Sequence, residues 1–117
     1  MAVTTDDVRR LALSLPRTTE HLVRDRIKFR VKQLVYCSFS RDEKLMGFGF
    51  PKEQRAALVE SEPDKFQLPP PADLRYQWVV ARLEALDNAE MTELVTDAWT
   101  MVVPQHVARD YFASLTR

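Results

Sequence analysis

One stretch of the chain alternates strictly between apolar and cationic residues. Within residues 23–32, Ile27, Phe29 and Val31 are apolar. The cationic positions around them are Arg24, Arg26, Lys28, Arg30 and Lys32. A period of two residues is typical of a β-strand with one buried and one solvated face. The pattern therefore predicts a strand over residues 24–31 whose solvated face is a row of positive charge.

The residues that follow predict a hairpin, with a turn at residues 32–34 and a returning strand. A three-residue loop places Phe29 opposite Cys37 on the apolar side, and Arg30 opposite Tyr36 on the cationic side. The same loop length places Lys28 opposite Ser38 on the cationic side. A two-residue loop would put the apolar residues of the returning strand among the cations, so the longer loop is favoured.

The rest of the chain predicts helices and strands around this hairpin. Helical patterns and boundary residues predict helices over residues 4–15, 51–61, 89–102 and 105–115. Further strands are predicted at residues 45–50, 66–68 and 76–83, and residues 17–22 form a polar connection with room for a short edge strand. Short turns join the central strands, so the expected fold class is α+β, an antiparallel β-sheet with helices packed on one face. At 117 residues, one domain over 1–117 is expected.

The first predicted helix has its own start and stop signals. Thr4 and Asp7 have the spacing of a capping box, in which each side chain bonds the backbone amide of the other residue. Asp6 and Asp7 also suit the positive end of the helix dipole. Pro16 ends the helix.

Small and aromatic residues indicate where surfaces pack. Gly47 and Gly49 occupy alternate positions of one strand, which predicts a close approach over that face or a bend. Trp78 lies in an apolar strand and Trp99 on the apolar stripe of a helix, so both are expected in the core.

The overall charge limits the classes of partner. The chain has 17 basic and 17 acidic residues and a formal net charge of zero. Generic adhesion to nucleic acid or to an anionic membrane is therefore not expected, and such binding requires local segregation of charge. No apolar run approaches the roughly 20 residues that span a bilayer, and the first residues lack the order of a signal peptide. With a single cysteine, Cys37, the expected location is the cytoplasm.

No pattern of residues predicts catalysis. Cys37 with His21 or His106 falls short of a zinc site and has no spacing typical of a thiolate–imidazole pair, so Cys37 is interpreted as a small buried hydrophobe. Two glycines are too few for a glycine-rich phosphate loop. A group of carboxylates on the 89–102 helix is interpreted as a solvated face: Glu90, Glu93 and Asp97. We expect no enzyme activity, no metal and no cofactor.

Six short segments, in order along nearly the whole chain, resemble the MmcQ/YjbR family. They are Leu15-Pro16, Lys28-Phe29-Arg30-Val31, Asp64-Lys65-Phe66, Tyr76-Gln77-Trp78-Val79, Ala98-Trp99 and Val103-Pro104. The resemblance implies a compact α+β domain with a frataxin-like or secretion-chaperone-like layout, and a suggested role in DNA binding. It implies no catalytic residues. The chain has Lys32-Gln33 where members often have glycine, and Gln105-His106 where they often have a basic pair.

The cationic row is the leading candidate site. Alternate residues of a strand lie about 6.6–7 Å apart, close to the phosphate spacing of an extended single strand or to twice the roughly 3.4 Å rise per nucleotide of a duplex strand. The leading hypothesis is a non-enzymatic module that contacts nucleic-acid phosphates, with an aromatic surface beside them. The candidate residues are Arg24, Arg26, Lys28, Arg30, Lys32 and Tyr36.

Other interpretations of the same row remain open. The cations could be neutralised by Asp25, Glu43 and neighbouring carboxylates, or their aliphatic stems could cover apolar surface. The chain could instead be a protein-interaction module, comparable to secretion chaperones, that uses an exposed sheet face or edge. A small-ligand protein or an enzyme of unrecognised chemistry is the third alternative. No membrane partner is expected.

Overall fold

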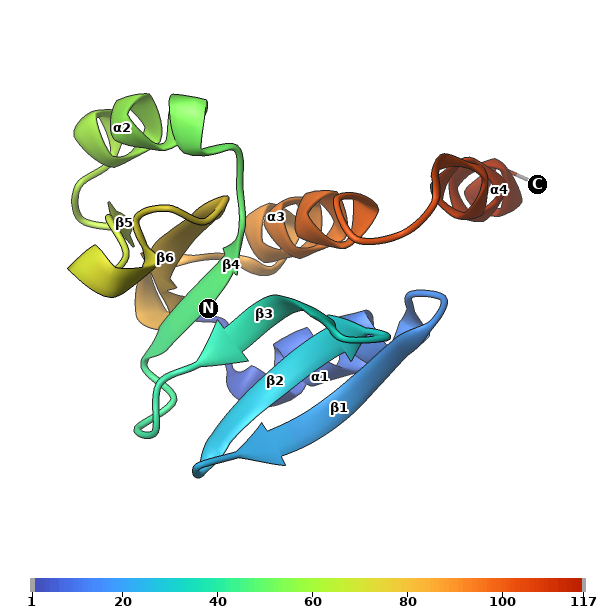
Figure 1. The fold of residues 1–117 in the computed structure, drawn as a ribbon, viewed down its shortest axis with the longest axis horizontal. Helices are drawn as coiled ribbons and strands as arrows, with labels where there is room; N and C mark the ends of the chain where they lie inside the picture. Colours follow the sequence, from blue (N-terminus) through green and yellow to red (C-terminus); the bar gives the residue numbers. More distant parts are fainter. Residues whose placement is uncertain (1, 117) are drawn as a thin grey trace.

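The computed structural model describes residues 2–116 and has a six-stranded sheet at its centre (Figure 1). The strand order is β1-β2-β3-β4-β6-β5, and every neighbouring pair is antiparallel. The strands are β1 (Thr18–Val23), β2 (Arg26–Val31), β3 (Leu34–Phe39), β4 (Leu45–Gly49), β5 (Phe66–Gln67) and β6 (Trp78–Arg82). The predicted α+β class is confirmed.

The structure also contains four α-helices: α1 (Thr5–Ser14), α2 (Lys52–Ser61), α3 (Asn88–Thr100) and α4 (Gln105–Leu115). Two short 3-10 turns complete the elements, η1 (Pro71–Asp73) and η2 (Leu83–Ala85). Helices α1 and α3 pack on each other and on strands β1, β3 and β4, while α2 packs against β5 and β6. In Figure 1, α2 and α4 lie at opposite ends of the molecule. None of the helices in the described part of the chain has the length and apolar character needed to cross a membrane.

The core lies between the sheet and the helices α1 and α3. Its largest fully buried side chains include Phe29, Phe39, Phe48 and Trp99. The rings of Phe29 and Phe39 meet edge to face, with centroids 6.1 Å apart, a geometry that aromatic pairs prefer. The apolar side of the predicted alternation is therefore the buried side.

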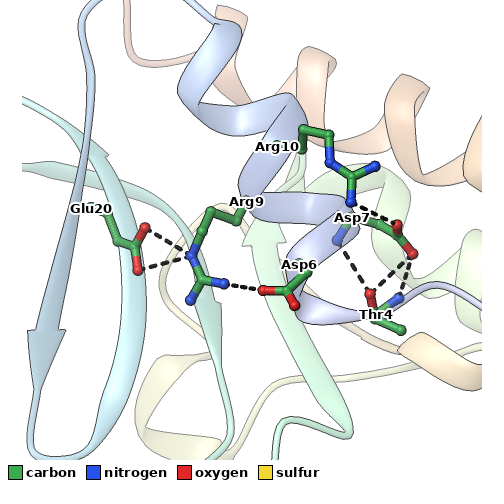
Figure 2. A network of polar contacts seen from close by, with 6 residues as sticks. All are labelled: Thr4, Asp6, Asp7, Arg9, Arg10 and Glu20. Carbon is green, nitrogen blue, oxygen red and sulfur yellow. Dashed lines mark hydrogen bonds and ion pairs between the residues drawn. The ribbon is translucent and has the colours of Figure 1, made fainter.

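The predicted capping box of α1 is present. The Thr4 hydroxyl accepts from the backbone N–H of Asp7 at 3.2 Å, and the Asp7 carboxylate accepts from the backbone N–H of Thr4 at 2.9 Å. The hydrogen bond from the Thr4 backbone holds the pKa of Asp7 below its usual value. Figure 2 shows a second contact that ties α1 to the sheet, in which Arg9 lies between Asp6 and Glu20 of β1. The contact between Arg9 and Glu20 joins α1 to β1 on the side of the sheet that faces the core, which we call the inner face.

Strand β2 begins two residues later than predicted, at Arg26. Arg24 and Asp25 both have positive φ, 53° and 64°, and form the tight turn between β1 and β2. Two successive positive φ values suit the right-handed twist of a hairpin. Residues 17–22, predicted as a polar connection with a short edge strand, form most of the six-residue strand β1.

The turn between β2 and β3 corrects the predicted register. Val31 pairs with Leu34 across a two-residue turn, and the register then shifts, so that Phe29 pairs with Cys37 as predicted. The predicted three-residue loop and the pairing of Arg30 with Tyr36 are wrong, because Arg30 pairs with Val35. Tyr36 is the extra residue of a β-bulge.

The bulge allows two successive residues, Tyr36 and Cys37, to be buried. Neither has exposed surface, although a regular strand sends consecutive side chains to opposite faces. The Tyr36 hydroxyl lies 2.8 Å from the Thr18 hydroxyl, and the two form a hydrogen bond. Burial raises the pKa of both Tyr36 and Cys37. Tyr36 therefore belongs to the core and not to the cationic face.

Candidate functional site

The outer face of the sheet, opposite the core, is the candidate site, and we call it the open face. One row of cross-strand partners runs over it from β1 to β5 and passes through every strand. Its members are His21, Lys28, Ser38, Gly47, Val80 and Gln67. The side chains in this row change from polar and cationic on β1 to β3 to small and apolar on β4 and β6.

Three of the predicted cations lie on the open face, and we call them the cationic strip: Arg26, Lys28 and Arg30. Arg26 is exposed, and the other two are half-buried. The Lys28 ammonium donates to the Ser38 hydroxyl at 3.2 Å. This bond directs the ammonium across β3, towards β4.

Arg30 is held at the β1 side of the strip. One of its terminal nitrogens lies 2.9 Å from Nδ1 of His21. Because a guanidinium can only donate, Nδ1 accepts, and the other ring nitrogen, Nε2, lies 2.8 Å from the Thr19 hydroxyl. The Nε atom of Arg30 is buried without a hydrogen-bond partner. A ligand oxygen or a water could satisfy that donor.

The strip is not neutralised by carboxylates. Among residues 2–116, none of the ion pairs includes Arg26, Lys28 or Arg30. Asp25 and Glu43, the acids expected as partners, also take part in none of these ion pairs. Glu20 lies on β1, but its carboxylate accepts from Arg9 at 3.0 Å on the helix side (Figure 2). The interpretation that nearby acids neutralise the row is therefore wrong.

The structure moves the other three candidates away from this surface. Arg24 lies in the turn between β1 and β2, where its carbonyl accepts from Arg41 at 3.3 Å. Lys32, with a φ of 54°, is exposed in the next turn. Tyr36 has no exposed surface, and its hydroxyl is paired with that of Thr18. The site therefore contains three of the six residues that the sequence predicts.

A cavity of about 610 Å³ hollows the open face next to the strip. Its lining includes Arg26, Lys28, Ser38, Gly47, Tyr76 and Trp78. A volume of this size falls in the range of small-molecule sites, which is about 300–1,000 Å³. The wall also includes the acidic residue Asp73 and apolar residues of β6 and the C-terminal end of α3, among them Val80, Ala98 and Met101. The cavity therefore combines cations and a hydroxyl with aromatic and apolar surface.

Trp78 forms part of the cavity wall and not of the packed core, so its predicted place in the core is wrong. It is half-buried, and its indole lies across Gly47, where an added Cβ would be only 2.4 Å from the indole Nε1. The predicted close approach over this glycine is confirmed, and the group that approaches is Trp78. Within residues 2–116, the indole N–H has no hydrogen-bond partner. The absence of a side chain at Gly47 was the sequence signal that could have located it.

Cys37 and His21, considered above as a thiolate–imidazole pair, lie on opposite faces of the sheet. Cys37 is buried on the inner face, and burial raises its thiol pKa, whereas His21 lies on the open face. The predicted small buried hydrophobe is confirmed for Cys37. Glu90 accepts from Lys65 at 3.2 Å. In the described part of the chain, no group of three or more His, Cys, Asp or Glu residues is placed to hold a metal ion.

Comparisons with known proteins agree with this architecture. The crystal structure of the Deinococcus radiodurans protein DR2400, described as a DUF419 domain, matches with a TM-score of 0.74 and 18% sequence identity. The match covers 86% of this chain and 78% of that one. No curated protein matches the sequence. The YjbR family model matches residues 13–101, which include the whole sheet and all of α2 and α3. The chain is therefore a member of the YjbR family.

Proposed function

We propose that the protein is a non-enzymatic binding module that contacts nucleic-acid phosphates through the cationic strip. The observation that carries the proposal is that Arg26, Lys28 and Arg30 lie on an open sheet face and have no carboxylate partner among residues 2–116. Their positions alternate along one strand, at intervals of about 6.6–7 Å. This interval suits successive phosphates of an extended chain.

The charge of the whole chain limits the strength of such binding. Formal net charge is zero, so attraction is confined to the face that carries the strip. With three phosphate contacts, the logarithm of the binding constant should fall with the logarithm of salt concentration at a slope of roughly −2 on a single strand. Binding should be weak, sensitive to salt and tolerant of sequence.

A salt titration of binding to a fluorescent oligonucleotide tests the proposal. Replacing Arg26 and Lys28 by serine should reduce the slope by roughly 1.4, because two counterion-releasing contacts are lost. Arg10 and Arg109 are exposed cations on α1 and α4, so the R10S/R109S variant is the control matched in charge. The proposal fails if the unmodified protein shows no binding at low salt, or if both variants change the slope equally.

A second candidate is binding of a protein partner along the edge of the sheet. Within the described residues β1 pairs with β2 alone, so its outer edge offers backbone groups to an added strand. Leu22 of β1 is 69% exposed beside that edge. Light scattering on the purified protein tests for addition by a second copy: a dimer lost on replacing Leu22 by lysine favours this candidate, and a monomer at all concentrations argues against self-association.

A further inference from the structure

We infer that the cavity on the open face holds an unpaired nucleobase against Trp78, with its phosphate on Arg26 and Lys28. The inference deepens the proposed function and rests on its phosphate contact with the cationic strip, to which it adds an unpaired base. The shared chemistry is an aromatic base joined to a phosphate. It could come from a single strand or from a free nucleotide.

The positions of the two ends of the cavity support this ligand. Lys28 Nζ is bonded to Ser38 on β3, and Ser38 pairs with Gly47, over which the Trp78 indole lies. Neighbouring strands are about 4.8 Å apart, so the ammonium and the indole lie about one strand apart. A single nucleotide, with its phosphate at one end and its base at the other, spans that interval.

The indole is free to serve as a stacking surface. Trp78 lies on the sheet only because Gly47 has no side chain, and its N–H is unpaired within the described residues. Tyr76, which also lines the cavity, is 50% exposed. Its ring lies under the Arg75 guanidinium, 4.8 Å from the centroid. Aromatic side chains beside cations are typical of surfaces that bind single strands without strong sequence preference.

A duplex does not satisfy this arrangement. Bases in a duplex are stacked on one another and cannot present a face to an indole unless they are extruded. Recognition of unpaired bases by aromatic side chains is common among proteins that bind single-stranded regions. We therefore expect a preference for single strands over a duplex of the same length.

Tryptophan fluorescence provides a direct test, because Trp99 is fully buried and Trp78 lines the cavity. The probes are adenosine 5′-monophosphate, ribose 5-phosphate, a single-stranded oligonucleotide and an abasic oligomer of the same length. The two base-containing probes should quench the fluorescence, and the two probes without bases should not. Trp78→Leu should weaken binding of the oligonucleotide about tenfold, and Trp78→Phe should restore most of it.

The outcomes separate this inference from the proposed function. If the abasic oligomer binds as tightly as the oligonucleotide and neither base-containing probe quenches, the inference is overturned while the phosphate contact stands. If the monophosphate quenches but no oligomer binds at low salt, the proposed function is overturned and the source of the base is a free nucleotide. If no probe binds, both are overturned. Circular dichroism of each variant verifies that it is folded.

Discussion

The two tryptophans show how differently the two sides of the sheet are built. Trp99 has no exposed surface, its N–H donates to the Pro16 carbonyl at 2.9 Å, and its ring meets Tyr111 with centroids 5.2 Å apart. Trp78 is half-buried and lies across Gly47, and its indole N–H makes no hydrogen bond within residues 2–116. The indole of Trp99 is fully buried, whereas the indole of Trp78 packs on Gly47 and keeps part of its surface exposed.

The same difference applies to the faces as a whole. On the inner face, apolar side chains are buried and the Tyr36 hydroxyl is paired. On the open face, within the part of the chain that the structure describes, the cations of the strip have no carboxylate partner and the buried Nε of Arg30 has no hydrogen-bond partner. The inner face therefore supplies most of the stability of the fold, whereas the open face carries polar groups that are left unpaired within the described residues. The following substitutions test that division.

The largest effect is expected for Trp99→Ala. Truncating a fully buried aromatic residue costs about 3–5 kcal/mol of the free energy of unfolding, through lost burial and the cavity left behind. Trp78→Ala should cost clearly less, because its ring is only partly buried and no hydrogen bond is lost. Urea denaturation of the two variants measures both costs. Equal losses would contradict the distinction between the faces.

Alkaline pH should lower the free energy of unfolding through Cys37, which is buried on the inner face. Burial raises the pKa of Cys37 from its reference of 9.0, so above pH 9 the unfolded chain loses the thiol proton while the folded chain keeps it. Stability is therefore fully present below pH 9 and falls above it, by at most about 1.4 kcal/mol per pH unit for one group. Urea denaturation from pH 8 to 10 checks this. Cys37→Ala should have a shallower dependence, and an unchanged dependence would show that the thiol is not responsible.

Tyr36→Phe isolates the hydrogen bond made by the bulge residue. Its loss leaves the Thr18 hydroxyl without this partner and should cost about 1 kcal/mol. Tyr76→Phe is the matched change on the open face and should be smaller, because Tyr76 is 50% exposed. Thermal or urea unfolding compares them. A cost at Tyr76 as large as that at Tyr36 would argue against the assignment of Tyr36 to the core.

The smallest effect on stability is expected for R26S/K28S. These side chains form no ion pair within the described residues, and such surface substitutions usually change stability by less than about 0.5 kcal/mol. The same variant should lose much of the salt-dependent oligonucleotide binding. Parallel unfolding and binding measurements on one preparation test both points. A large loss of stability would show that the strip supports the fold after all.

Several features of the fold could be predicted because they depend on neighbouring residues. The capping box of Thr4 and Asp7 is local, and it is present. Alternation around Phe29 predicts which side of β2 is buried, because exposing that side would cost apolar burial at several positions at once. The pairing of Phe29 with Cys37 follows from the same argument.

The site was harder to predict, for two physical reasons. The residues from Trp78 to Val80 are all apolar, so this run has no period to distinguish the inner face from the open face. The bulge at Tyr36 depends on a hydroxyl of β1 and on space beneath the helices, which distant segments supply. Glycine at position 47 indicated a close approach but not the group that makes it.

Local patterns of residues were enough to predict the α+β class, the side of β2 that is buried and the cations on its other side. Each of these depends on residues a few positions apart, where the costs of burying charge or exposing apolar surface are large. The folded chain was needed to show that Tyr36 is buried, that Arg24 and Lys32 lie in turns, and that Trp78 lies across Gly47. These outcomes depend on contacts between strands that are distant in sequence, and their energies become available only once the sheet has formed.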